Sequence, residues 1–352
     1  MLSPALGAGE EPKGGARRAR QLGLVTLLLG VLAVVAIVSL GFGRVQIPPA
    51  TVAAILASTV VPLEPGWTDA EALIVLGVRL PRVVAAVLVG AALAAAGAAY
   101  QNLFRNPIVS PDILGVSAGA GFGASLGVML RAGEAGIQGF AFASGLLAVA
   151  VCFAIGQAIN RHSMIVLVLV GVVIAAFFQA MISILKIVAD PVDVLPTITF
   201  WLLGGLNKVT PGDLPLAAAV IALSLAALFT LRWQINVMSL GPEEARTLGV
   251  NVGGTRLLLV IAATLMTAAA VSVAGIVGWV GLVVPHMARI LVGAAFDRLL
   301  PVTVVLGGLF LLLVDDVSRA ASSMEIPLGI TTSVIGAPLF LFLLLRVRTT
   351  WA

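Results

Sequence analysis

Residues 103–123 read "LFRNPIVSPDILGVSAGAGFG", a stretch that combines helix-breaking prolines with a run of glycines. A glycine-rich loop that holds phosphate follows a strand and carries a lysine, as in the motif G-x-x-x-x-G-K-[ST]. The stretch has neither feature, and this motif occurs nowhere in the chain. Its glycines instead recur every fourth residue, along one stripe of a helix: Gly115, Gly119, Gly123 and Gly127. Small residues at this spacing let helices approach closely in lipid, so we predict a helix-packing stripe and no nucleotide site.

The two prolines lie just before this predicted helix. Pro107 and Pro111 separate one apolar run from the next. A tight turn outside the hydrocarbon core suits them, because backbone groups that proline leaves unpaired can reach water there. We place this turn on the cytoplasmic side and expect Ser110 or Asp112 to cap the following helix.

The composition excludes a water-soluble fold. Of the 352 residues, 60% are hydrophobic and only 10% are charged, against about 25% charged residues in soluble domains. An all-α membrane protein is predicted. The net charge of +4 is small and does not indicate nucleic-acid binding. Cys152 is the single cysteine, so we expect no disulfide framework, no metal site and no cofactor in this chain.

A membrane span needs about 20 apolar residues. Nine runs lack charged residues: 21–43, 83–104, 113–130, 137–160, 163–185, 214–231, 257–288, 299–314 and 326–345. The run 257–288 would rise ~48 Å as one helix, against a hydrocarbon core of ~30 Å. We therefore predict a hairpin that is broken near Gly275 and Gly278, which makes ten spans. The first run lacks a cleavage site of the A-x-A type and is interpreted as a retained span.

The basic residues indicate how the spans are oriented. With the N-terminus inside, 13 of the 20 lysines and arginines fall in cytoplasmic segments. Residues 1–20 then form a cytoplasmic tail, and both termini are cytoplasmic. Two outside segments contain apolar stretches too short to span, at 50–61 and 194–206. They are predicted to be surface helices, with Trp67 and Trp201 suited to the membrane interface.

A second informative segment is "SLGPEEARTLGVNV", residues 239–252, on the cytoplasmic side between two spans. Pro242 fits a first helical turn, acidic residues follow it at the positive end of the helix dipole, and Gly249 can end the helix. A short helix outside the membrane is predicted. It is either a solvated connecting loop or a lever that docks into a partner that uses ATP.

Five segments stand in order along the chain: "LGVRLPRVVAAVLVGAALAAAG", "FRNPIVSPDILGVSAGAG", "LGPEEARTLGV", "GIVGWVGLVVPHMARILVG" and "EIPLGITTSVIGAPLFLFLL". Together they resemble the FecCD-type permease family of ABC importers. The resemblance implies a type II ABC importer fold, with ten spans in one permease domain over residues 21–348 and an inverted relation between spans two to five and seven to ten. It also implies a permease dimer, two cytoplasmic ATPase subunits, and a periplasmic or lipid-anchored binding protein. The setting would be the bacterial inner membrane.

The resemblance also assigns roles to residues, none of them catalytic. The helix that couples to the ATPase is expected to use Gly241, Glu243, Glu244, Ala245, Arg246 and Gly249. Docking of the binding protein is assigned to Arg79, Arg82 and Arg319, which otherwise would reach lipid phosphates. Ser163 and Met164 are the candidates for a cytoplasmic gate.

Several polar residues within the spans have two readings. Asp315 and Asp316 could bind a cation, but Arg319 offers a local partner and favours a structural role. His286 is either a haem ligand or a residue at the cytoplasmic helix boundary, and His162 is a residue of a cytoplasmic turn. The same choice between interhelical hydrogen bonds and passage lining applies to the polar side chains Gln101, Asn102 and Gln179.

Two other classes of protein remain. A secondary transporter needs acidic residues within the membrane for ion coupling, and the spans hold none besides Asp315 and Asp316. A structural scaffold would not need a capped cytoplasmic helix. The cargo is not readable from the sequence. An iron–siderophore is the first choice, followed by haem, cobalamin and oxyanions such as molybdate.

Overall fold

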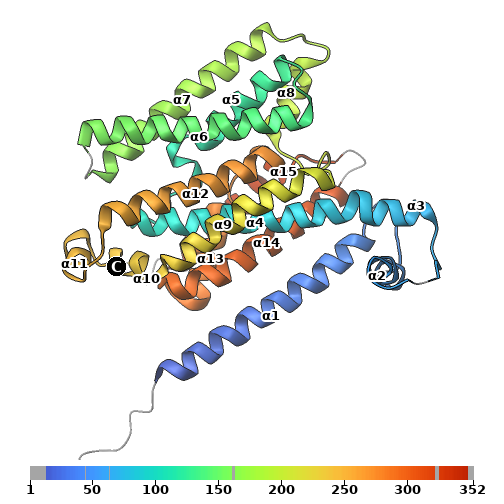
Figure 1. Ribbon diagram of the computed structural model, residues 1–352, viewed down its shortest axis with the longest axis horizontal. Coiled ribbons are helices and arrows are strands. Elements are labelled where there is room, and N and C mark those ends of the chain that lie inside the picture. Colours follow the sequence, from blue (N-terminus) through green and yellow to red (C-terminus); the bar gives the residue numbers. More distant parts are fainter. Residues whose placement is uncertain (1–12, 44, 63, 161–162, 322–324, 348–352) are drawn as a thin grey trace, which may run out of the picture.

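A computed structural model describes residues 13–43, 45–62, 64–160, 163–321 and 325–347. Within these ranges all regular elements are helical. The long helices form a bundle (Figure 1): α1 (Lys13–Gly41), α4 (Leu80–Leu103), α6 (Gly133–Asn160), α7 (Met164–Val188), α9 (Leu214–Thr230), α12 (Val252–Ala274), α14 (Phe296–Ala320) and α15 (Leu328–Val347). The shorter ones are α2 (Pro49–Ser58), α3 (Asp69–Ala72), α5 (Val116–Met129), α8 (Val194–Leu203), α10 (Arg232–Met238), α11 (Pro242–Thr247) and α13 (Val280–Val292). A π-helix η1 (Leu73–Arg79) and two 3₁₀ turns, η2 (Pro111–Leu114) and η3 (Pro211–Asp213), complete the set.

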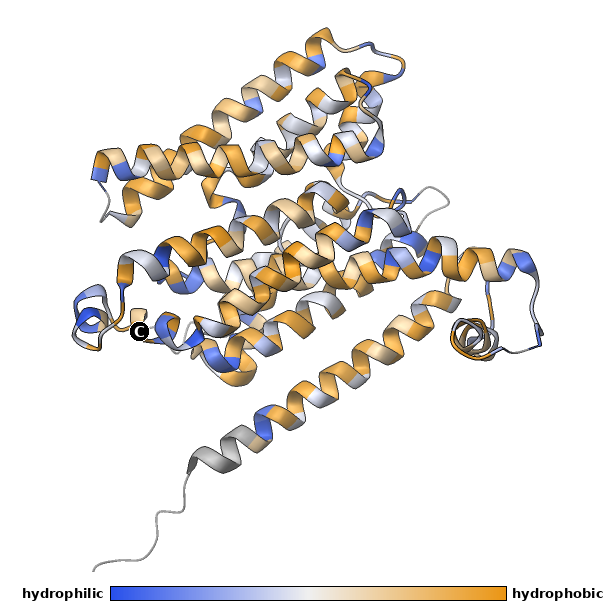
Figure 2. Cartoon of the chain, viewed as in Figure 1, coloured by the Kyte–Doolittle hydropathy of each residue, from blue (hydrophilic) through white to orange (hydrophobic). Residues whose placement is uncertain are grey.

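Eight helical segments of the described chain are long and apolar enough to cross a bilayer, and four shorter apolar helices accompany them. Polar residues gather toward the two ends of the bundle (Figure 2). α11 lies at one end, and α3 and α8 lie at the opposite end (Figure 1). The chain is therefore a multi-pass membrane protein whose polar elements face two opposite sides.

The centre of the bundle is formed by α4, α12 and α14. Of the apolar window of α12, 72% lies inside the protein, and of that of α14, 61%, against 6% for α1. Small residues allow this packing: Gly90 of α4 faces Gly307 of α14, and a Cβ on Gly307 would lie 2.6 Å from the Cβ of Ala94. Helices can approach this closely only where glycine and alanine line the contact.

The second span begins earlier than the sequence suggests. α3, η1 and α4 form one helical segment, Asp69–Leu103, which starts with a capping box between Thr68 and Glu71. The predicted span at 83–104 thus starts too late, because Arg79 and Arg82 are part of the same helical segment of 35 residues and not of a separate segment before it. The helix can carry both because their guanidinium groups have partners inside the protein. α1 likewise begins within the predicted tail, at Lys13.

The predicted break in the run 257–288 is confirmed. α12 ends at Ala274, Gly275 follows with a φ of +68°, and α13 starts at Val280. Trp279 precedes α13 with a φ of +70°, which is rare for a residue with a large side chain. The predicted stretches 50–61 and 194–206 are also confirmed as short helices, α2 and α8 of ten residues each.

The glycines of the opening stretch lie between α5 and its neighbours. A Cβ on Gly119 would lie 2.5 Å from the Cβ of Ala148 of α6, and one on Gly123 would collide with the carbonyl oxygen of Phe140. Gly127 also faces α6. Gly115 differs, because it is the left-handed residue (φ +84°) that joins η2 to α5.

The expected cap of this helix is not formed. Ser110 makes no side-chain capping bond. Asp112 lies in η2, where its carboxylate accepts a hydrogen bond from the hydroxyl of Ser117. Gly115 itself precedes the first residue of α5, so neither candidate is placed to cap that helix.

Candidate functional site

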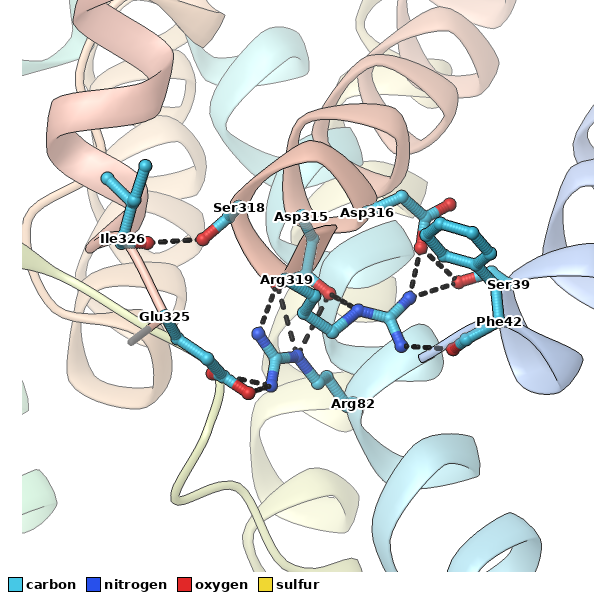
Figure 3. A network of polar contacts seen from close by, with 9 residues as sticks. All are labelled: Ser39, Phe42, Arg82, Asp315, Asp316, Ser318, Arg319, Glu325 and Ile326. Atoms are coloured by element: carbon cyan, nitrogen blue, oxygen red, sulfur yellow. Dashed lines mark hydrogen bonds and ion pairs between the residues drawn. The ribbon is translucent and has the colours of Figure 1, made fainter. Parts of the chain in front are cut away.

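A network of charged side chains, most of them buried, joins α4, α14 and the segment before α15 (Figure 3). Arg82 donates through Nε to Asp315 Oδ2 at 2.9 Å and through Nη2 to Oδ1 at 2.9 Å. Its Nη1 donates to Glu325 Oε2 at 2.9 Å and to Oε1 at 3.1 Å. The guanidinium therefore lies between two carboxylates, and it contacts both oxygens of each.

Arg319 extends this network to α1. Its Nε lies 3.3 Å from Asp315 Oδ2, and its Nη2 donates to Asp316 Oδ1 and, at 2.7 Å, to the hydroxyl of Ser39. Ser39 donates in turn to Asp316 at 2.6 Å. The local pairing predicted for Arg319 with the two aspartates is confirmed. The structural reading of Asp315 and Asp316 is consistent with these pairings, since each carboxylate binds an arginine.

Arg79 holds the segment that follows α1. Its Nη1 donates to the carbonyl oxygen of Leu40 at 2.7 Å, and its Nη2 donates to that of Val45. Gly43 passes so close that a Cβ there would lie 2.8 Å from Nη2 of Arg79. The guanidinium thus binds one backbone carbonyl in the last turn of α1 and one just after that helix.

The expectation that Arg79, Arg82 and Arg319 present exposed charges is therefore wrong. Arg79 and Arg82 are each only 7% exposed, and the side chain of Arg319 is also 7% exposed. A charge within a membrane protein needs an internal partner, and all three have one. A docking role for these residues has no exposed guanidinium to support it in this structure.

A cavity of about 840 Å³ lies at the same end of the protein. Arg82 and Glu325 line it together with α8, the loop after α8 and the end of α12. Lys208 and Glu134, which form an exposed ion pair at 3.2 Å, belong to its wall. Trp201, expected at the membrane interface, also lines this cavity.

Near this cavity, the turn between α7 and α8 is organised by Asp190. Its carboxylate accepts the backbone N–H groups of Asp193 at 3.0 Å and of Val192 at 2.9 Å. These two bonds favour the ionised form and lower the pKa of Asp190.

The predicted coupling helix is α11, six residues long. Gly241 precedes it with a φ of +146°, Pro242 is its first residue, and Gly249 follows with a φ of +80°. Ala245 is fully buried against Val237 and Val250, which anchors α11 to the end of the bundle.

The polar residues of α11 point outward. Glu243 accepts a hydrogen bond from Arg246 at 2.6 Å, and both side chains are at least half exposed. Glu244 is exposed as well. Exposed pairs of this kind contribute little to stability, so these residues are free to serve contact with a partner.

The gate candidates lie at the start of α7. The hydroxyl of Ser163 accepts the N–H of Val166 at 3.3 Å and caps the helix. Met164 is the first residue of α7 and packs against the main core. His162 lies outside the described residues. The capping bond gives Ser163 a structural role that the sequence alone did not indicate.

His286 does not lie at a helix boundary. It is 4% exposed, six residues after the start of α13, and its ring packs edge-on against Phe340 of α15 with centroids 6.0 Å apart. Within the described part of the chain, neither ring nitrogen has a hydrogen-bond partner. The boundary position predicted for it is therefore wrong.

The polar side chains of the spans differ in their partners. Gln101 donates to the carbonyl oxygen of Gly281 at 3.2 Å and accepts from Arg289 at 3.0 Å, which is the interhelical bonding expected. Asn102 bonds within its own helix, to Ala98 at 2.8 Å. Gln179 is exposed.

Residues 31–346 match the FecCD transport family. The chain belongs to this family. Members of the FecCD family include permease subunits of ABC transporters, such as the molybdate import permease MolB of Haemophilus influenzae. That protein is 35% identical over 90% of this chain and 94% of its own length.

Other FecCD permeases are similar over most of their length. A probable iron chelatin permease of Helicobacter pylori is 40% identical over 78% of this chain and 83% of its own. The cobalamin import permease BtuC of Halobacterium salinarum is 41% identical over 80% and 76%, respectively. A solved metal-chelate type ABC transporter in an inward-facing conformation superposes with a TM-score of 0.83 at 34% identity, over 92% of this chain and 99% of that one.

Proposed function

We propose that this chain is the permease subunit of an ATP-driven importer that carries an iron–siderophore or a similar metal chelate across the bacterial inner membrane. The match to the FecCD family over residues 31–346 carries this proposal. The similar iron chelatin permease and the metal-chelate transporter structure support the class of cargo.

The partners follow from the same family. Two copies of the permease, or two related permeases, would form the passage, and two ATPase subunits would bind the cytoplasmic side through α11. A periplasmic or lipid-anchored binding protein would deliver the cargo at the opposite end. α11 suits its part because its anchor residue, Ala245, is buried while Glu243 and Glu244 are exposed.

We also infer ten spans and an inverted repeat. The eight long helical segments would be joined by α5 and α13, which have 14 and 13 residues. A break in the helix precedes each of these two: η2 and Gly115 come before α5, and residues 275–279 come before α13. α5 packs on α6 and α7, as α13 packs on α14 and α15, and α4 contacts α14 as α12 contacts α6. The two sets of neighbours correspond if spans two to five are matched with spans seven to ten.

Growth tests can decide the cargo. A deletion strain would be supplied with single iron sources, with haem, or with cobalamin in an auxotrophic background. Restored growth on one ferric siderophore by the plasmid-borne gene would support the first choice. Normal growth of the deletion strain on every iron source would contradict it.

Molybdate is the second candidate cargo. It is favoured by the similarity to MolB, which extends over 90% of this chain. Uptake of radiolabelled molybdate by the same deletion strain, with sulfate as competitor, separates this candidate from a metal chelate. Loss of molybdate uptake alone would favour the oxyanion.

A further inference from the structure

Three helix ends meet at the outer end of the bundle. α8 and α12 both end there, and α15 begins there. The N–H of Gly205, just after α8, donates to the carbonyl oxygen of Ala274 at the end of α12, at 2.8 Å. The N–H of Leu328, the first residue of α15, donates to the carbonyl oxygen of Gly204 at 3.0 Å. The start of α15 and the end of α8 are thus joined by their backbones.

Glycine makes this junction possible. A Cβ on Gly204 would lie 2.6 Å from the carbonyl oxygen of Ile276, and one on Gly329 would lie 2.5 Å from that of Leu203. Gly204 and Gly275 also have positive φ values, of +74° and +68°. Because backbone contacts backbone without intervening side chains, the three helix ends cannot shift separately without breaking these hydrogen bonds.

Side chains connect the junction to the rest of the outer end at two points. Ile326, two residues before α15, exchanges hydrogen bonds with Ser318 of α14. Glu325 binds Arg82 of α4. Arg82, Ser318, Glu325, Ile326 and Leu328 all line the cavity of about 840 Å³. The width of this cavity therefore depends on how the segment 325–328 is held against α4 and α14.

The free energy needed to break the ion pair with Arg82 differs between the two carboxylates. The side chain of Asp315 is 0% exposed, so without Arg82 it would be a buried charge whose one remaining partner among the described residues is Arg319. The side chain of Glu325 is 35% exposed. If Glu325 turns into the cavity, water solvates it, and Arg82 keeps its hydrogen bonds to Asp315. Of the two pairs, only the one with Glu325 can open cheaply.

We propose that the Arg82–Glu325 ion pair is a releasable latch that holds the junction of α8, α12 and α15, as one unit, against α4, and that its opening widens the outer cavity. The latch does not depend on which cargo is carried. It rests on the proposed orientation only in that the cavity faces outside.

Thiol accessibility tests the latch in the full-length chain. Ser272 of α12 lines the cavity and is 8% exposed. A Ser272→Cys probe, in a Cys152→Ala background, would be treated with a membrane-impermeant methanethiosulfonate in right-side-out vesicles. Glu325→Gln should raise its rate of modification about two- to fivefold, the range by which a partly exposed ion pair shifts an equilibrium.

Glu134→Gln is the matched control, because it removes the same charge from the wall of the same cavity but leaves α15 untouched. In the Glu134→Gln variant, the rate at which the reagent modifies the Ser272→Cys probe should equal the rate measured with the probe alone. An unchanged rate in Glu325→Gln, or an equal rise in Glu134→Gln, would overturn the latch.

Thermal unfolding in detergent shows whether the Glu325→Gln variant is still correctly folded. A loss of stability in Glu325→Gln as large as that in Asp315→Asn would make Glu325 a structural partner and also overturn the proposal. Exposed Ala135, as Ala135→Cys, reports the orientation separately. If it fails to react from outside, the orientation is wrong, and the same comparison of rates is made in inside-out vesicles.

Discussion

Asp315 is the residue on which the outer network depends. It is fully buried and lies between the guanidinium groups of Arg82 and Arg319. Breaking a buried ion pair by neutralising one partner leaves an uncompensated charge, which costs about 3–5 kcal/mol. We expect Asp315→Asn to lower the free energy of unfolding by about that much. Glu325→Gln should cost about 1 kcal/mol or less, because its side chain is partly hydrated.

Thermal unfolding of both variants in detergent measures this difference. A similar midpoint for Asp315→Asn and wild type would show that water or another group reaches the buried guanidiniums. That Asp315 has a partner could be suspected from the sequence, since a charge within a span requires one, and Arg319 was the partner predicted. Its pairing with Arg82, 233 residues away in the chain, was not predicted. Glu325 could not be assigned in that way, because it lies in a loop where carboxylates are ordinary.

At the level of elements, the contact between α5 and α6 sets the packing of the α5–α7 group. We predict that Gly119→Leu and Gly123→Leu each prevent correct assembly, because both glycines lie against α6 with no room for a Cβ. Overpacking of this kind costs about 1–3 kcal/mol or more. Gly139→Leu on α6 is the control, since a Cβ there meets nothing within 4 Å. Wild-type stability in both test variants, measured by unfolding in detergent, would contradict the packing role.

Substitutions of exposed residues in α11 should have little effect on the free energy of unfolding, because this helix has only six residues. We expect Glu243→Lys combined with Glu244→Lys to leave the permease folded but to reduce transport strongly, because both carboxylates are exposed and only Glu243 is paired. Uptake and ATPase activity of the assembled complex are the measurements. Glu64→Lys with Asp69→Lys makes the same charge change at the opposite end. Undiminished uptake by the α11 variant would leave α11 as a connecting loop.

For the whole molecule, the sequence predicted the helical membrane fold and the break at Gly275 because hydrophobic length is a direct physical constraint. It misjudged where spans begin when a charge lay within a helix. Arg82 was placed outside because the partner that stabilises it, Asp315, is 233 residues away. The prediction that His286 lies at a helix boundary failed for a related reason. The residues next to it in the chain do not reveal whether a histidine lies at the end of a helix or is buried against another helix.

The orientation of the molecule is the last prediction. Of the basic residues that the sequence places outside, Arg79, Arg82 and Arg319 are buried and paired, so they no longer count against a cytoplasmic N-terminus. The remaining asymmetry favours the α11 end as cytoplasmic. An impermeant thiol reagent added outside should modify Ala135→Cys, in the first turn of α6, and should not modify Ser110→Cys, next to η2 at the other end of α5. Both probes would be placed in the Cys152→Ala background, with the reagent applied again after the membrane is permeabilised. Because the two sites flank one short helix, the opposite pattern would require the whole bundle to be inverted, and α11 could then not meet an ATPase in the cytoplasm.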